Sequence, residues 1–90
     1  MIQAQIEIIN KLGLHARAAA KFIGCTGHFA AKVRVGKDPS ILVDGKSIMA
    51  VMMLAAAKGT LLHVCIEGKD ELEAWEALQS LINNRFDEGE

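Results

Sequence analysis

The sequence has no tyrosine, one tryptophan and one proline, and aromatic residues fill only 4% of its 90 positions. It also has no run of basic residues, and its formal net charge is −1. Proteins that bind nucleic acid or acidic membrane surfaces need concentrated positive charge, often with aromatic side chains between the basic ones. These deficits argue against nucleic acid and membrane surfaces as partners.

Long hydrophobic runs are missing too. The longest stretch without a polar residue, residues 48–57, has ten residues, whereas a membrane-spanning helix needs about 20. The N-terminus lacks a charged segment followed by an apolar one, so no secretory signal is visible. We therefore expect a cytoplasmic protein without membrane insertion.

The sequence has few residues that could form a disulfide or bind a metal ion. The two cysteines, Cys25 and Cys65, stand forty positions apart and form no CxxC pair. We interpret them as reduced, buried thiols, and a disulfide or a metal pair is the alternative. Because the chain also lacks clustered metal ligands, we predict no metal and no cofactor.

The most informative stretch is a glycine-bearing loop that delivers one histidine to a run of strong helix formers: Gly13-Leu14-His15-Ala16-Arg17, continued by residues 18–22. The first turn of a helix has backbone N–H groups without intrahelical partners and a positive dipole end, so it binds anions. His15 can lie beside the amides of Ala16 and Arg17, and the Arg17 guanidinium adds donors suited to phosphate. The pattern indicates a histidine that accepts a phosphoryl group; a plain capping or surface histidine is the alternative.

The same pentapeptide resembles the active-site signature of HPr, the histidine-containing phosphocarrier family of the bacterial phosphotransferase system. The resemblance implies that His15 accepts the phosphoryl group on Nδ1 and that Arg17 assists. It also implies Enzyme I, charged by phosphoenolpyruvate, as donor and EIIA-type proteins as acceptors, so that the chain is a carrier and not an enzyme. Many family members have proline after the arginine. Ala18 stands there in this chain, which leaves the helix intact and restores an N–H.

Hydrophobic periodicity predicts the element order β-α-β-β-α-β-α. The strands are expected at residues 1–9, 29–35, 40–43 and 60–67, the helices at 16–25, 48–57 and from Asp70 to about Ile82, and turns at 36–39 and 44–45. We expect a single α+β domain, 1–90, with four antiparallel strands covered on one face by three helices. The HPr resemblance, which includes Lys46-Ser47-Ile48-Met49 and Lys58-Gly59-Thr60, supplies the open-faced β-sandwich topology.

The periodicity also predicts which side chains face the core. These are Ile2, Ala4, Ile6, Ile8, Ala19, Phe22, Ile23, Phe29, Ala31, Val33, Val35, Leu62, Val64, Ile66, Leu72, Trp75, Leu78, Leu81 and Ile82. Gly27 is expected to end the first helix, and Asp70 and Glu73 have the spacing of a capping box. His28 and His63 are interpreted as structural residues, and residues 86–90 as an acidic tail.

Residues 48–57 are apolar on every face, although a helix on a small domain buries about one stripe. With Ser47 as its N-cap, we expect Ile48, Met49 and Met52 to face water as a docking surface, because methionine adapts to differently shaped partners. A more deeply buried helix is the alternative. The resemblance agrees, since this helix helps HPr-like proteins bind their partners. We add Ala16 and Ala20 as docking residues.

Lys46-Ser47-Ile48-Met49 resembles the site at which a dedicated kinase, HPr serine kinase/phosphorylase, modifies some family members. This implies a regulatory role for Ser47, where a phosphate would repel partners that carry their own phosphate; a plain helix cap is the alternative. We expect a monomer. Residues 10–13, the methionine-rich helix and residues 86–88 look more like the nitrogen-related branch of the family. Regulation through partner binding, without sugar uptake, is therefore the alternative function.

Overall fold

The protein's structure is a computed structural model, which describes residues 1–89. The elements are β1 (Ile2–Glu7), α1 (Ala16–Thr26), β2 (Lys32–Asp38), β3 (Ile41–Asp44), α2 (Ile48–Met53), β4 (Leu61–Glu67), α3 (Glu71–Asn83) and a 3-10 turn, η1 (Arg85–Asp87). The predicted order of strands and helices is confirmed. The turn η1 was not predicted.

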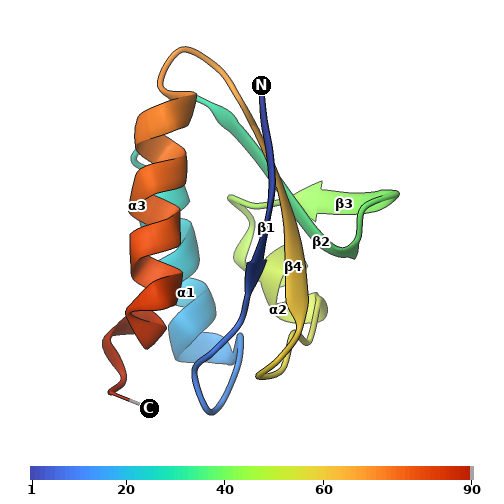
Figure 1. Ribbon diagram of the computed structural model, residues 1–90, viewed down its shortest axis with the longest axis vertical. Coiled ribbons are helices and arrows are strands. Elements are labelled where there is room, and N and C mark those ends of the chain that lie inside the picture. Colours follow the sequence, from blue (N-terminus) through green and yellow to red (C-terminus); the bar gives the residue numbers. More distant parts are fainter. Residues whose placement is uncertain (90) are drawn as a thin grey trace.

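The four strands form one antiparallel sheet in the order β1-β4-β2-β3. Strand β4 is central: it pairs with β1 from Ile66 to Leu61 and with β2 from Glu67 to His63. Helices α1 and α3 lie side by side on one side of the sheet (Figure 1), and α2 contacts α1 and β3. The predicted α+β open-faced sandwich is therefore confirmed.

A single apolar core fills the space between the sheet and the helices, and most of the predicted core residues are buried in it. Leu72 is an error of prediction, because 56% of its surface is exposed. The buried residues of α3 are Ala74, Leu78 and Ile82, which are four positions apart and so share one face. Leu72 precedes Ala74 by two positions, which is about 200° around the helix.

The segment that leads into β2 also differs from the prediction. The strand begins at Lys32, because the backbone N–H groups of Ala30 and Ala31 donate to the carboxylate of Asp70, at 2.9 and 2.8 Å. At its other end β2 continues to Asp38, through residues assigned to a turn, with a register shift against β3 after Val35. The charged and turn-forming residues at 36–39 suggested a turn, but such residues can also continue a strand where the hairpin contains a bulge.

The Asp70 contacts overturn the predicted capping box. Asp70 is the N-cap residue of α3, but its side chain makes no capping hydrogen bond. Its carboxylate connects α3 to residues 30 and 31 instead, and the first-turn carboxylate of Glu71 accepts from the Gly68 N–H at 3.1 Å. The predicted end of α1 is confirmed, since Gly27 is its C-cap.

Helix α2 is shorter than predicted, because it ends at Met53 and not at residue 57. Ala55 has φ +50°, a conformation that interrupts a right-handed helix. The backbone that follows α2 forms hydrogen bonds with the N-terminal part of the chain. The Ala56 carbonyl accepts from Leu14 N–H at 2.8 Å, and Gly59 N–H donates to the Ile8 carbonyl at 2.7 Å. The segment after α2 therefore supports the loop that precedes α1.

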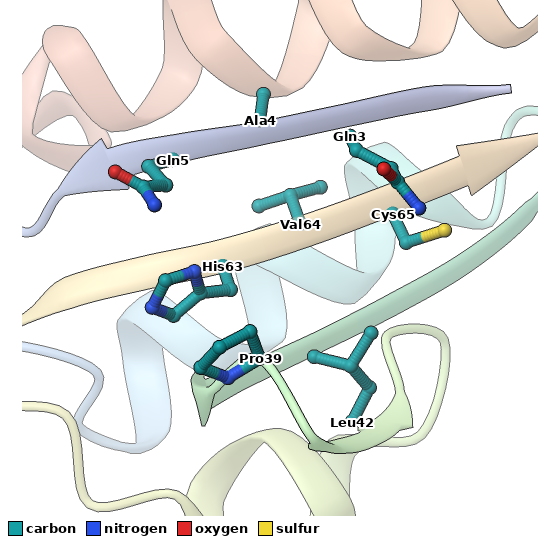
Figure 2. A pocket seen from close by; sticks show the side chains of 8 residues that line it. All are labelled: Gln3, Ala4, Gln5, Pro39, Leu42, His63, Val64 and Cys65. Atoms are coloured by element: carbon teal, nitrogen blue, oxygen red, sulfur yellow. The ribbon is translucent and has the colours of Figure 1, made fainter.

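The face of the sheet opposite α1 and α3 carries a hollow of about 610 Å³ (Figure 2). It is lined by Gln3, Ala4, Gln5, Pro39, Leu42, His63, Val64 and Cys65. Both cysteines are free thiols, as predicted. Cys65 is also buried as predicted, whereas Cys25 is only half-buried. Burial raises the pKa of the Cys25 thiol.

The part of the chain that the structure describes, residues 1–89, offers neither a metal-binding cluster nor a membrane-spanning helix. No group of three or more histidine, cysteine or carboxylate side chains could hold a metal ion there. No helix in the same range has the length and apolar character needed to cross a membrane.

Candidate functional site

The loop before α1 is fixed by a close backbone approach. Gly13 has φ +66°, and a Cβ built on it would lie 2.4 Å from the Ala56 carbonyl oxygen, so only glycine fits there without strain. Leu14 follows as a buried anchor, with 5% of its surface exposed. These contacts determine where the next residue, His15, enters the first helix.

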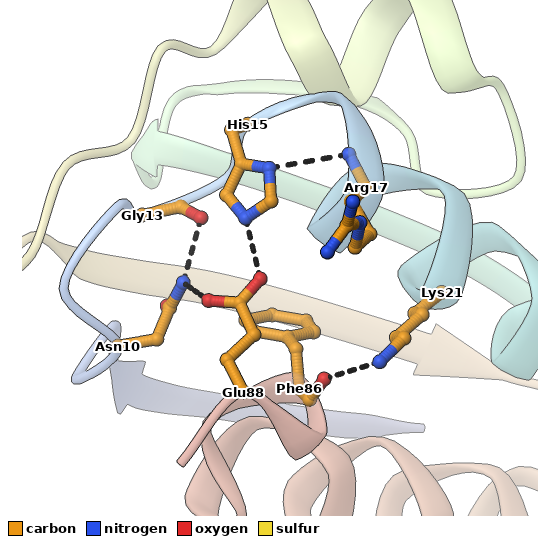
Figure 3. Close-up of polar contacts among 7 residues, drawn as sticks. All are labelled: Asn10, Gly13, His15, Arg17, Lys21, Phe86 and Glu88. Carbon is orange, nitrogen blue, oxygen red and sulfur yellow. Dashed lines mark hydrogen bonds and ion pairs between the residues drawn. The ribbon is translucent and has the colours of Figure 1, made fainter. Parts of the chain in front are cut away.

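His15 is the N-cap of α1, with extended backbone angles of φ −73° and ψ 178°. Its carbonyl accepts the first helical hydrogen bond from Ala19 N–H at 2.8 Å. Its side chain turns back over the helix start, and Nδ1 accepts the backbone N–H of Arg17 at 3.2 Å (Figure 3). The predicted placement of the histidine at a helix N-terminus is therefore what the structure has.

Helix residues beside His15 are arranged as the sequence suggested. Ala16 and Arg17 are exposed, and the Arg17 side chain lines a cleft with His15 and Lys21. Ala18 is completely buried and continues the helix. The first-turn amides of α1 lack intrahelical acceptors, as at any helix N-terminus.

A carboxylate from the C-terminal segment completes the site, and sequence reasoning missed it. Glu88 Oε2 lies 2.5 Å from His15 Nε2, while its Oε1 accepts from Asn10 Nδ2 at 3.0 Å (Figure 3). Asn10, which is completely buried, also donates from Nδ2 to the Gly13 carbonyl at 2.8 Å. Asn10 thus connects the histidine loop to the carboxylate that contacts the histidine.

The environment of Glu88 favours its ionised form. Burial alone would raise the pKa of this carboxyl, but hydrogen bonds from Asn10 and His15 outweigh it, helped by the positive charge of Lys21. The pKa of Glu88 is therefore lowered from its ordinary value. About 15% of the Glu88 side chain and 28% of the His15 side chain are exposed.

The turn η1 places Glu88 by an unusual backbone path. Arg85, Phe86 and Asp87 all have positive φ, between 52° and 62°, which costs about 1–2 kcal/mol for each non-glycine residue. Phe86 is completely buried and holds the turn in the core. A phenylalanine inside an otherwise acidic tail was the one signal in the sequence that this segment returns to the fold.

The side chains predicted to form the docking surface are all exposed. Ala16, Ala20, Ile48, Met49 and Met52 are all exposed, on α1 and α2. Leu12 and Met53 were not predicted but are also exposed, by 68% and 79%. The exposure expected for the second helix is thus confirmed, and the deeper burial considered as the alternative is not found.

Ser47 caps α2, as predicted: its Oγ accepts from Ala50 N–H at 3.3 Å. The side chain is half-buried. Because α2 has only six residues and not the ten predicted, its dipole offers less stabilisation to a phosphate on Ser47 than the sequence suggested.

Comparison with known proteins places these features in a family. Residues 2–84 match the family model described as "PTS HPr component phosphorylation site". The phosphocarrier protein HPr of Pseudomonas aeruginosa is 69% identical over 86 residues, which are 96% of each chain. That of Neisseria meningitidis is 56% identical over 90 residues and the full length of both chains.

A solved structure agrees with the sequence relatives. The crystal structure of HPr-C-His from Thermoanaerobacter tengcongensis superposes with a TM-score of 0.91, at 41% identity over 98% of each chain. The match therefore covers the sheet, the helices and the His15 loop together. This chain belongs to the HPr family of phosphocarrier proteins of the phosphotransferase system.

Proposed function

We propose that this chain carries a phosphoryl group on Nδ1 of His15, which it accepts from Enzyme I and passes to EIIA-type proteins. Family membership implies a relay of this kind. The observation that supports His15 as the acceptor is its position as N-cap of α1, with Nδ1 beside the Arg17 amide. A nucleophilic nitrogen and an anion-binding helix end therefore meet at one point.

The transfer needs a nucleophilic nitrogen and hydrogen-bond donors for the phosphoryl oxygens. In the transfer, the Nδ1 lone pair forms a bond to phosphorus as the bond from phosphorus to the donor breaks. The Arg17 amide, the Ala16 amide and the Arg17 guanidinium then stabilise the phosphoryl oxygens. The phosphoryl group leaves again at each cycle, so the chain acts as a carrier and not as an enzyme. We place this relay in the cytoplasm, where phosphoenolpyruvate is made and used.

The docking surface supports exchange between two partners. Ile48, Met49 and Met52 present flexible or branched apolar side chains on α2, which contacts α1. Ala16 and Ala20 present small side chains on α1, next to the histidine and one turn along, so a partner can approach the site closely. We propose that Enzyme I and EIIA-type proteins use this same surface in turn, with the chain as a monomer.

We also propose Ser47 as a regulatory position. A phosphate on its Oγ, the atom that accepts from Ala50 N–H, would add about two negative charges beside Ile48 and Met49. These charges would repel a partner that arrives phosphorylated. Incubation with HPr serine kinase/phosphorylase and ATP tests this, and an unmodified Ser47 contradicts it. No observation favours the nitrogen-related alternative function.

The test of the proposed function is phosphorylation by Enzyme I and phosphoenolpyruvate, followed by intact mass and acid treatment. We expect one acid-labile phosphoryl group on the wild type and none on His15→Ala. His28→Ala and His63→Ala are matched controls that retain it. If Enzyme I charges another HPr but not this chain, or charges His15→Ala equally, the proposal is wrong.

A further inference from the structure

The two ring nitrogens of His15 have different partners. Nδ1 faces a donor, the Arg17 backbone N–H, at 3.2 Å. Nε2 faces the Glu88 carboxylate at 2.5 Å. An ionised carboxylate accepts hydrogen bonds and donates none.

These partners determine which nitrogen carries the proton of the neutral ring. Since Nδ1 accepts from Arg17, its lone pair points at the helix end and it carries no hydrogen. The proton is then on Nε2, which donates it to Glu88. The opposite tautomer would place two N–H donors against each other at Nδ1 and two lone pairs against each other at Nε2.

From this arrangement we propose that Glu88 is a positioning residue, which holds the proton of His15 on Nε2 and so leaves the Nδ1 lone pair ready to attack phosphorus. The inference rests on the proposed function, because it concerns the same phosphoryl transfer. It assigns a role to the C-terminal segment, about which the active-site pentapeptide says nothing.

The role follows from the electron balance of the step. As Nδ1 bonds to phosphorus, the donor's leaving group takes the electron pair of the broken bond. No proton has to leave Nδ1, because it carries none. The proton stays on Nε2 and the ring becomes positively charged, next to the carboxylate of Glu88. A fixed negative charge beside a developing positive one stabilises the transition state.

Glu88 is held in place by contacts on both sides. Asn10 donates to its other oxygen at 3.0 Å, and the Lys21 ammonium donates to the Phe86 carbonyl at 2.7 Å. The charged side chains that line the cleft with His15 and Glu88 are Lys11, Arg17, Lys21 and Asp87. The cleft thus has two carboxylates, Glu88 and Asp87. Glu88 is hydrogen-bonded to the histidine, whereas Asp87 accepts from Asn84.

The variant Glu88→Gln tests the proposal most sharply. The carboxylate oxygens serve two donors, Asn10 Nδ2 and His15 Nε2. A glutamine has one oxygen, so its NH₂ must face one of the two donors. Asp87→Asn makes the same change of charge in the same cleft, keeps an oxygen for Asn84, and tolerates the positive φ of that position.

The primary readout is the ¹⁵N shifts of the His15 ring in unphosphorylated protein, which report the tautomer whether or not phosphoryl transfer occurs. We expect the Nε2–H tautomer in the wild type and in Asp87→Asn. In Glu88→Gln the tautomer ratio should move toward Nδ1–H by about tenfold, the contribution of one charge-assisted hydrogen bond. Equal shifts in wild type and Glu88→Gln would overturn the proposal.

Transfer kinetics give the second readout. Glu88→Gln should lower kcat for phosphorylation by Enzyme I by about tenfold with little change of KM, because the docking residues are untouched. Glu88→Asp, which keeps the charge, should recover part of the loss. A changed tautomer with wild-type kcat would contradict the role of Glu88. Failure of the wild type to accept a phosphoryl group would instead contradict the proposed function.

Discussion

Lys21 and Phe86, sixty-five positions apart, are joined by a 2.7 Å hydrogen bond from the lysine Nζ to the phenylalanine carbonyl. Lys21 lies on α1, the helix that begins after His15, and Phe86 lies in η1. The bond therefore connects the helix of the candidate site to the segment that supplies Glu88. Both the stability of this turn and the geometry of the site depend on how Phe86 packs.

Replacement of Phe86 by alanine should destabilise the protein by about 3–5 kcal/mol, since Phe86 is completely buried and its removal leaves a cavity in the core. Leu72→Ala is the matched control. The exposed Leu72 should contribute within about 0.5 kcal/mol. Urea unfolding measures both free energies, and similar values for the two variants would refute the packing described here.

Two glycines, Gly13 in the loop before His15 and Gly24 near the end of α1, should respond to alanine in opposite directions. Gly13→Ala adds a Cβ 2.4 Å from the Ala56 carbonyl at φ +66° and should cost about 2–4 kcal/mol. Gly24→Ala adds a Cβ in open space on α1 and should stabilise by about 0.5–1 kcal/mol. Thermal unfolding checks the signs, and a tolerated Gly13→Ala would count against the close approach of the two loops.

Asp70 should make stability depend on pH. The Ala30 N–H lowers the pKa of this carboxyl, burial opposes the change, and the Ala31 N–H adds to it, so the folded pKa lies below the ordinary 3.8. The stabilisation is therefore complete above pH 3.8 and is lost as pH falls through the folded pKa.

Urea unfolding of wild type and Asp70→Asn across this range measures the effect. The difference in unfolding free energy should be largest near neutral pH and shrink toward pH 3. Glu73→Gln changes the same charge in the first turn of α3, where no side-chain cap forms, and should have the smaller effect. A larger effect at Glu73 would restore the capping box that the sequence suggested.

Loss of the Arg17 guanidinium should slow phosphoryl acceptance, because Arg17→Ala removes a charged donor but keeps the backbone N–H that faces Nδ1. Charge-assisted hydrogen bonds contribute about 1.5–3 kcal/mol, which corresponds to a rate about 10–100-fold lower. Arg34→Ala removes the same charge from β2, where Arg34 contacts Cys65, and serves as control. Equal rates for the two variants would remove Arg17 from the mechanism.

Much of the fold could be predicted because local patterns and burial agree. The alternation of Leu62, Val64 and Ile66 on β4, and the helical spacing of Leu78 and Ile82 on α3, match the buried faces of the structure. Errors arose where a long-range contact decides the outcome. Asp70 has cap spacing in the sequence but binds the backbone at residues 30 and 31.

In the candidate site, too, the features set by local sequence could be predicted and those set by long-range contacts could not. The position of His15 and Arg17 at a helix start follows from local sequence, since a glycine loop precedes a run of helix formers. The partners of the histidine do not. Glu88 reaches His15 only because Phe86 is buried and three residues adopt positive φ. The phenylalanine was a local hint of the first fact, but the positive φ angles have no local signature. Asn10 likewise becomes a site residue through contacts with both segments.

The most direct test of the central claim is a reconstituted relay with ³²P-phosphoenolpyruvate, Enzyme I, this chain and an EIIA-type acceptor. The account predicts that label reaches the acceptor through the wild-type chain, and that His15→Ala stops it while His63→Ala does not. Label that reaches the acceptor equally well through His15→Ala would contradict the account. So would a wild-type chain that transfers nothing under conditions in which another HPr supports the relay.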